Sequence, residues 1–191
     1  MTTVHGNDVC VVLISGSPSR DSRSRQLLGR AARAFARAGA RPLLVDLSQL
    51  PADALLGRTR APPVDEALAA VADAQIVAVS TPVYRASYSG LLKVFFDLLP
   101  PGVLAGKVAL PIATGGSAAH QLVIDHALRP LLASLDAMVV ASGVYGTDSQ
   151  FGPPTGPDAG LLARTDRAVQ EALAIAAAGN TGPMSPHTIE E

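Results

Sequence analysis

The sequence predicts an α/β domain with an open, five-stranded parallel sheet and helices on both of its faces. Short runs rich in β-branched residues, without polar alternation, recur five times, and segments of helical periodicity separate them. The length of 191 residues suits one domain. We expect the strand order 2-1-3-4-5, a single domain over residues 1–178 and a disordered tail over residues 179–191.

The first strand and the first helix carry the clearest pattern. Residues 9–14 form a buried run, and helical periodicity follows over residues 24–38. Gly39 ends this helix, as glycine commonly does, and residues 42–47 are predicted as the second strand. The apolar face of the helix consists of Leu27, Leu28, Ala31, Ala34 and Phe35.

The remaining elements follow from the same alternation. Residues 51–63 and 147–160 are irregular, and Pro111 is unfavourable in the fourth strand because it removes one ladder hydrogen bond. Phe95 and Phe96 are adjacent on one helix, so we expect one of them to lie at an interface between subunits. The predicted strands cover residues 75–80, 107–113 and 137–141, and the predicted helices cover residues 64–74, 91–99, 119–134 and 160–178.

Charge and composition exclude several classes of protein. The formal net charge is −1, so no excess of cations is available for general nucleic-acid binding. No run of about twenty uncharged apolar residues is present, and the polar N-terminus does not resemble a signal peptide. The lone Cys10 is expected to fill the core. We therefore expect a cytoplasmic protein with no metal centre and no membrane contact.

The loop after the first strand, "SGSPSRDSRS", is rich in hydroxyls. Ligands of open parallel sheets bind at the carboxyl ends of the strands, where the strand order reverses. Ser17, Ser22 and Ser24 lie there beside the start of a helix, whose N–H groups attract anions. The dinucleotide and triphosphate glycine motifs are both absent, which favours a terminal monophosphate. The alternative is an ordinary helix cap, for which Ser22 or Ser24 alone suffices.

The loop after the third strand, "STPVYRASYSG", contains two of the three tyrosines in the chain. Tyr84 and Tyr88 are candidates for flanking a planar ring. The alternative is a packing loop in which Ser87 or Ser89 caps the next helix.

The loop after the fourth strand, "ATGGS", has paired glycines at Gly115 and Gly116. Glycine lets a backbone approach a ligand closely and direct N–H groups at it. The alternative is a tight turn without a ligand. Each loop alone is weak evidence, but one ligand at this edge of the sheet would contact all three.

Three separated stretches carry a family resemblance. "GSPSRDSRS", "TPVYRASYSGLLKVFFDLLP" and "ATGGSAAHQLVIDHALRPLL" resemble the NADPH-dependent FMN reductases, in particular the reductase components of two-component alkanesulfonate and methanesulfonate monooxygenases. The resemblance implies a flavodoxin-like fold, FMN and NADPH or NADH as cofactors, and a flavin reductase activity. It also implies a partner monooxygenase that receives reduced FMN, and a homodimer or homotetramer.

The resemblance further implies which residues bind FMN. The phosphate is expected in the first loop, at Ser17, Ser22, Arg23 and Ser24. The isoalloxazine ring is expected beside the other two loops, at Pro82, Val83, Tyr84, Thr114, Gly115 and Gly116.

One position departs from the alkanesulfonate-type reductases. Those proteins carry an inserted tyrosine in the helix after "TGG", which forms a π-bulge at a subunit interface, and His126 stands at the matching position. A histidine there is more similar to the methanesulfonate-type relatives. His126 is therefore a candidate for a π-bulge and an oligomer contact, and the alternative is a solvent-facing or helix-packing histidine.

No side-chain arrangement for hydrolysis or acid–base catalysis is visible in the sequence. We therefore expect no catalytic side chain, because the flavin carries the chemistry and the protein binds and orients it. A flavodoxin-like electron carrier and a quinone or azo reductase with bound FMN remain alternatives. Arg20, Arg23 and Arg85 are all candidates to bind the 2′-phosphate of NADPH, and nothing in the sequence selects one of them.

Overall fold

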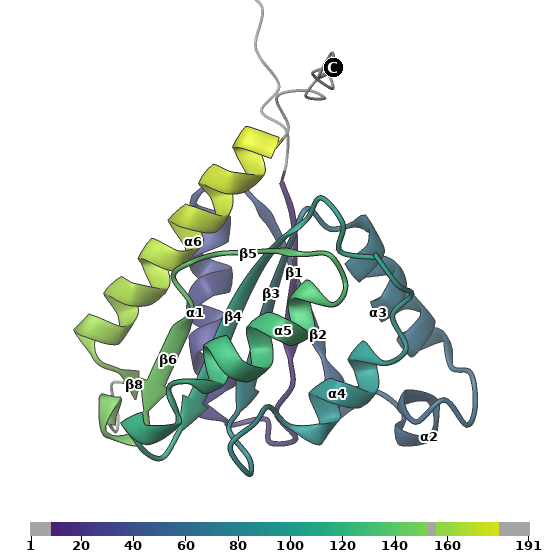
Figure 1. Ribbon diagram of the computed structural model, residues 1–191, viewed down its shortest axis with the longest axis horizontal. Helices are drawn as coiled ribbons and strands as arrows, with labels where there is room; N and C mark the ends of the chain where they lie inside the picture. Colours follow the sequence, from purple (N-terminus) through teal and green to yellow (C-terminus); the bar gives the residue numbers. More distant parts are fainter. Residues whose placement is uncertain (1–8, 153–155, 180–191) are drawn as a thin grey trace, which may run out of the picture.

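A parallel sheet forms the centre of the structure (Figure 1). The computed structural model describes residues 9–152 and 156–179. The six strands of the sheet are β1 (Cys10–Ser15), β2 (Arg41–Asp46), β3 (Ile76–Pro82), β4 (Val108–Gly115), β5 (Met138–Val139) and β6 (Val144–Thr147). Their order is β2-β1-β3-β4-β5, with β6 also paired to β4, and every pair is parallel. The predicted strand order is confirmed.

Helices cover both faces of the sheet, as predicted. The longer helices are α1 (Arg23–Arg37), α3 (Pro62–Asp73), α4 (Gly90–Phe96) and α6 (Ala159–Gly179), and the shorter ones are α2 (Ala52–Leu55) and α5 (Arg129–Ala133). Helices α1 and α6 lie side by side on one face, whereas α3, α4 and α5 pack on the other (Figure 1). The carboxyl ends of the strands point toward the bottom of this view.

The strands divide their side chains between two cores. Val12 and Ile14 of β1 face α3 and α4, whereas Val11 and Leu13 face α1 and α6. All four are nearly inaccessible to solvent, which explains why the run lacks polar alternation. The expectation that Phe95 or Phe96 serves an interface is wrong. Both are buried in the core, with their rings 6.3 Å apart in an edge-to-face arrangement.

The fifth strand is interrupted, in contrast to the continuous strand predicted over residues 137–141. Strands β5 and β6 pair with the two ends of β4 and leave residues 140–143 between them. Pro111 supplies the physical reason. Successive residues of β4 direct their backbone groups to opposite sides: Val108 donates a hydrogen bond toward β3, and Ala109 accepts one from Val140. Pro111 therefore faces the same side as Ala109, where it has no N–H to donate and the pairing breaks.

Two charged side chains hold this break in place. Arg129 donates hydrogen bonds to the carbonyls of residues 139–141, at 3.0–3.4 Å. Glu171 of α6 accepts hydrogen bonds from the N–H groups of Ala141 and Ser142, at 2.7 and 3.0 Å. Partial burial alone would raise the pKa of the Glu171 carboxyl, but these hydrogen bonds and the charge of Arg129 bring it below its usual value.

The helix predicted over residues 119–134 is also divided. It consists of a 3₁₀ turn, η2 (Ala118–His120), a π-helical segment, η3 (Ile124–Leu128), and α5. Pro130 lacks an N–H, and its ring would meet the carbonyl of residue 126 in a regular α-helix. The wider π turn directly before it avoids that contact, and His126 lies within this turn.

The loop predicted over residues 147–160 contains short elements. It has a 3₁₀ turn, η4 (Asp148–Gln150), and an antiparallel hairpin of β7 (Phe151–Gly152) and β8 (Gly156–Pro157). Gly179 ends α6, and the rest of the predicted tail lies outside the described residues. No helix within residues 9–152 and 156–179 is long and apolar enough to cross a membrane.

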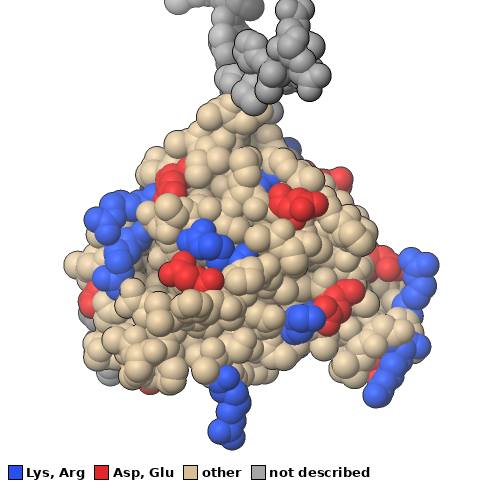
Figure 2. Space-filling model, viewed as in Figure 1, with Lys and Arg blue, Asp and Glu red and all other residues tan. Residues whose placement is uncertain are grey.

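Basic and acidic side chains are interspersed on the face shown in Figure 2. The main group of basic side chains in this view lies over α6, with acidic side chains close to it. This distribution agrees with the net charge of −1 and offers no broad basic field on this face for a polyanion.

Candidate functional site

A cavity of about 570 Å³ opens at the carboxyl edge of the sheet, where the three loops meet. Ser17 and Ser24 are buried in the first loop and are not part of its lining. All the other residues expected to bind FMN line the cavity, together with Asp21, Gln26 and Asp148. The expected residues in the lining are Ser22, Arg23, Pro82, Val83, Tyr84, Thr114, Gly115 and Gly116.

The first loop presents unused donors to the cavity. Ser22 caps α1, and its Oγ accepts a hydrogen bond from the N–H of Arg25 at 3.2 Å and lies 3.2 Å from the Oγ of Ser24. The N–H groups of Arg23 and Ser24 have no acceptor within the described part of the chain. The first turn of α1 therefore offers two backbone donors, with the positive end of the helix dipole behind them.

The second loop is a tight turn at the mouth of the cavity. Tyr84 and Ser87 exchange backbone hydrogen bonds at 2.9 and 3.1 Å. Arg85 and Ala86 between them both have positive φ angles, 52° and 62°, which side chains other than glycine adopt only at an energetic cost. This turn leaves Tyr84 half exposed in the cavity wall, whereas Tyr88 packs against the core. Only one of the two tyrosines is therefore placed to contact a ligand.

Three hydrogen bonds join the three loops, and a fourth lies within the second loop. Gly16 donates its N–H to Ser80 at 2.8 Å, and its carbonyl accepts a hydrogen bond from the Ser89 hydroxyl. The N–H of Ser89 donates to Thr81 Oγ1 at 2.9 Å. Val83 in turn donates its N–H to the carbonyl of Thr114 at 2.8 Å. The first loop is thus bonded to the second, and the second to the third.

Tyr145 of β6 supports the third loop from below. Its hydroxyl donates a hydrogen bond to the carbonyl of Ser117 at 2.7 Å. A Cβ atom on Gly115 would lie 2.4 Å from that hydroxyl, so a side chain at this position would displace the tyrosine. Burial, together with the nearby charge of Asp148, raises the pKa of Tyr145 and keeps its hydroxyl protonated. Gly116 is exposed and lines the cavity, and its N–H has no acceptor among the described residues.

An ion pair spans the cavity between the first loop and the loop after β6. Nη1 of Arg23 lies 2.8 Å from Oδ1 of Asp148, and the Arg23 guanidinium stacks 5.9 Å from the centre of the Phe151 ring. Asp148 was not among the predicted site residues. Asp148 directly follows β6, whose carboxyl end also lies at this edge of the sheet, and that position was the available signal.

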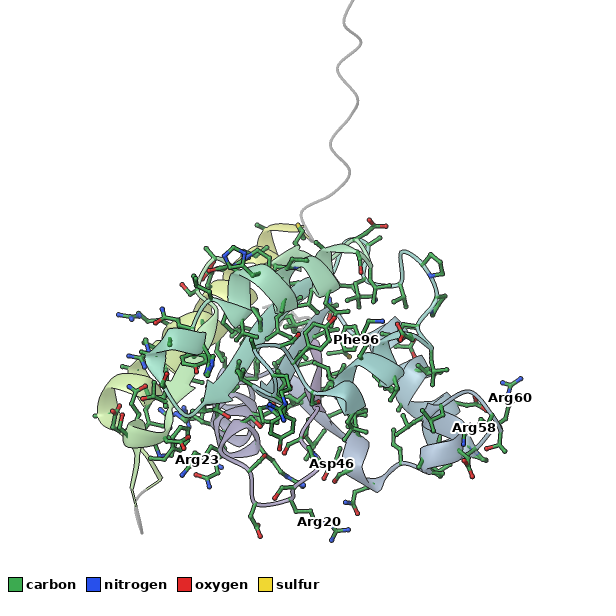
Figure 3. All side chains as sticks on the ribbon, turned by 60° about the horizontal axis from the view of Figure 1, so that its bottom comes forward. Arg20, Arg23, Asp46, Arg58, Arg60 and Phe96 are labelled. Atoms are coloured by element: carbon green, nitrogen blue, oxygen red, sulfur yellow. The ribbon has the colours of Figure 1, made fainter. Side chains whose placement is uncertain are left out.

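The three arginines considered for a nucleotide phosphate have different surroundings. Arg23 pairs with Asp148, and Arg20 donates to the side-chain carbonyl of Gln49. Arg85 has no partner within the described residues. Figure 3 shows Arg23 at the lower left, Arg20 at the bottom below Asp46, and Arg58 and Arg60 at the right-hand end of the molecule.

The two histidines within the described residues lie outside the cavity lining. His126 is exposed in the π-helical segment, and His120 is exposed in η2. Within residues 9–152 and 156–179 no three His, Cys, Asp or Glu side chains are grouped to hold a metal ion. The cavity lining offers backbone N–H donors, hydroxyls, the Gln26 amide, one arginine and the carboxylates of Asp21 and Asp148.

Comparison with known proteins identifies the family. The family described as NADPH-dependent FMN reductase matches residues 9–152. The chain belongs to this family. A Pseudomonas putida protein named FMN reductase (NADPH) is 40% identical over 186 residues, 95% of this chain and 94% of that protein. The NADH-dependent FMN reductase SfnE of P. putida is 35% identical over 169 residues, 86% of this chain and 91% of that protein.

The solved structure of an NADH:FMN oxidoreductase, EmoB, is similar to this FMN reductase throughout. It superimposes with a TM-score of 0.79 and 38% sequence identity, over 91% of each chain. The flavodoxin-like fold and the FMN reductase activity that the resemblance implied are thus confirmed, with FMN and NAD(P)H as cofactors.

The contact between Gly115 and Tyr145 gives a prediction for stability. Gly115→Ala should destabilise the FMN reductase by about 2 kcal/mol, because the new methyl group overlaps the tyrosine hydroxyl. Tyr145→Phe should cost about 1 kcal/mol through the lost hydrogen bond to Ser117. In the double variant the Gly115→Ala cost should fall by half or more, since the hydroxyl is gone. Urea denaturation of all four proteins measures this coupling, and simple additivity would contradict it.

Proposed function

We propose that the 570 Å³ cavity is where this FMN reductase binds FMN, with the phosphate at the first loop and the ring between the second and third loops. One observation carries the proposal. Two residues of the cavity lining have backbone N–H groups without an acceptor among the described residues, Arg23 on one side and Gly116 on the other, and the N–H of Ser24 follows that of Arg23 in the first turn of α1. A ligand with a dianion at one end and a polar ring edge at the other satisfies both sets.

The phosphate end is preorganised by α1. The N–H groups of Arg23 and Ser24, the hydroxyl of Ser22 and the Arg23 guanidinium all donate to an anion placed at the helix start. Ser17 and Ser24 are buried in the first loop. The Ser17 hydroxyl accepts a hydrogen bond from the N–H of Ser19 at 3.2 Å. This bond helps to shape the turn.

At the ring end of the cavity, a backbone N–H group takes the role that a catalytic side chain has in other enzymes. FMN, when bound, supplies the redox chemistry by accepting hydride from NADPH or NADH. The N–H of Gly116 stabilises the negative charge that develops at the pyrimidine edge of the ring, as a fixed donor does in an oxyanion hole. Pro82, Val83 and Thr114 form the wall of this end. The open side toward Tyr84 leaves room for the nicotinamide.

The sparse aromatic lining favours an enzyme that releases its flavin over an electron carrier. Among the described residues, Tyr84 is the one aromatic side chain in the cavity lining, and it is half exposed. One aromatic residue cannot enclose both faces of the ring. We infer that reduced FMN leaves this cytoplasmic enzyme and is consumed by a partner monooxygenase.

A homo-oligomer is part of the proposal. The π-helical segment places His126 at the surface, and the neighbouring Leu122 is 60% exposed. An exposed leucine beside an irregular helical turn supports a contact between copies of the chain. Light scattering at micromolar concentration should give the mass of a dimer or tetramer, and a monomeric mass would contradict this part of the proposal.

The phosphate contacts provide the test of the proposed site. The purified protein should oxidise NADPH or NADH rapidly with FMN and at least tenfold more slowly with subsaturating riboflavin, which lacks the phosphate. The difference should lie in the KM for the flavin, since the ring chemistry is the same. Equal KM values for FMN and riboflavin would show that the first loop does not bind the phosphate.

The ion pair between Arg23 and Asp148 predicts opposite effects for its two members. Arg23→Ala should raise the Kd of FMN about five- to tenfold, with little change in the hydride-transfer rate of the saturated complex. Asp148→Asn should lower that Kd about two- to fivefold, because the carboxylate no longer competes with the phosphate for Arg23. Calorimetry gives both Kd values, and stopped-flow absorbance gives the rate.

Arg58→Ala is the matched control for these two variants, because Arg58 is exposed and lies at the far end of the molecule (Figure 3). Riboflavin is the second control and should bind all the variants alike. A weaker FMN affinity in Asp148→Asn would overturn the competition between carboxylate and phosphate.

A further inference from the structure

A second cavity, of about 430 Å³, lies on the other side of the third loop from the proposed FMN site. Its walls come from η2, η3, β6 and α6, and none of the described residues lines both cavities. Gly116 lines the FMN cavity and Ala118 lines the second one, and Asp148 and Thr147 divide in the same way. The volume falls within the range of small-molecule sites, roughly 300–1,000 Å³. Nothing in the proposed FMN site uses this space.

Arg164 of α6 brings a positive charge to this cavity without an acidic partner. Its Nη2 atom donates to the backbone carbonyl of Tyr145 at 3.4 Å and to the side-chain carbonyl of Gln150 at 3.2 Å, and both acceptors are neutral. Within residues 9–152 and 156–179 no carboxylate pairs with this guanidinium, and its Nε and Nη1 atoms have no acceptor. Two of its nitrogen atoms are therefore available to an anion.

The acidic groups around the second cavity already have partners. Asp125 also lines the cavity, but its Oδ1 lies 3.2 Å from Nε of Arg129. Glu171 directs both carboxylate oxygens to backbone N–H groups in the strand break, at 2.7 and 3.0 Å. Asp158 accepts a backbone hydrogen bond at the start of α6, at 2.7 Å. Among the described residues of the lining, Arg164 is thus the one charged group without an opposite charge beside it.

The rest of the lining offers polar groups and a small apolar wall. The side-chain amide of Gln121 has no partner in the described part of the chain, so it can both donate and accept a hydrogen bond. Thr147 adds a hydroxyl, and Ala118 and Ile124 add apolar surface. A ligand that matches this lining combines one acidic group with a hydroxyl and a short hydrocarbon part.

We propose that the second cavity binds a small hydroxycarboxylic acid as a monoanion, separately from the flavin. The carboxylate lies against Nε and Nη1 of Arg164, where hydrogen bonds are strengthened by both charges. The hydroxyl lies toward Gln121 and the hydrocarbon part toward Ile124. A second carboxylate on the ligand would approach Asp125, which disfavours dianions. The inference does not depend on the proposed FMN site, because the two cavities share no lining residue.

The test titrates two probes into the wild-type enzyme saturated with FMN, which keeps the acid out of the first loop. The probes are L-lactate and 1,2-propanediol, which has the same carbon skeleton without the charge. ¹H–¹⁵N NMR follows the side-chain amides of Gln121 and Gln150, which line the second cavity, and of Gln26, which lines the FMN cavity. Lactate should shift the first two signals with a Kd of about 1–10 mM and leave Gln26 unchanged. Propanediol should bind about tenfold more weakly or not at all.

Two variants assign the binding to one side chain. Arg164→Ala removes the guanidinium and should raise the Kd of lactate about fivefold or more. Arg167→Ala is the matched control, because Arg167 is exposed on the same helix and outside the cavity lining, and it should change that Kd less than about twofold. Thermal melting checks both folds. Where Arg164→Ala is unstable, the comparison of lactate with propanediol on the wild-type enzyme carries the test.

Three results would overturn the inference. The first is a set of shifts at Gln121 and Gln150 that does not saturate, or that propanediol reproduces at equal concentration. The second is a shift of Gln26 with displacement of FMN, which would place the acid in the first loop. The third is a loss in Arg167→Ala as large as in Arg164→Ala, which would indicate general attraction to surface charge. None of these results touches the proposed function, which the comparison of FMN with riboflavin tests by itself.

Discussion

The two backbone hydrogen bonds of Gly16 hold the functional edge of the sheet together. A parallel sheet brings the ends of β1, β3 and β4 to one edge, but it does not fix the loops that follow them. Gly16 bonds through its N–H to β3 and through its carbonyl to the Ser89 hydroxyl, which also caps α4 through the N–H of Leu92 at 3.1 Å. The position of the first loop thus depends on the second. A cavity with donors at both ends needs this connection, since a shift of either loop would separate them.

The sequence was sufficient for the central strands because each is buried on both faces. Val11 to Ile14 and Ile76 to Val79 alternate between two helical layers, so every position is apolar and the run is visible without an alignment. The same pattern could not predict the interruption of the fifth strand or the division of the helix before it. Their irregular course is stabilised by Arg129 and Glu171, which contact residues 139–142 from up to 30 positions away. Pro111 and Pro130 indicate that regular hydrogen bonding stops opposite the fifth strand and in the helix before it. A proline does not indicate which backbone conformation replaces the regular one.

The positions of the three loops of the candidate site could be predicted from the sequence, but the ion pair between Arg23 and Asp148 could not. Each loop could be assigned to the carboxyl end of a strand from local pattern alone. Which tyrosine reaches the cavity depends on the turn at Arg85 and Ala86, whose positive φ angles no residue type in "VYRAS" indicates. Asp148 pairs with Arg23 across 125 positions of sequence, through the placement of η4 beside α1. Such a contact follows from the packed fold and has no local signal.

The exposure of that ion pair bears on how firmly the enzyme holds its flavin. The side chains of Arg23 and Asp148 are 47% and 46% exposed, so water screens the pair and limits its contribution to about 1 kcal/mol or less. In the proposed FMN site, the phosphate would therefore displace Asp148 from Arg23 at small cost. The displaced carboxylate would stay close to the bound anion, however, and lower its affinity. A carrier that keeps its flavin gains nothing from an acid at this point, whereas an enzyme that must pass reduced FMN onward gains faster release. Asp148 thus fits a flavin that is bound as a substrate.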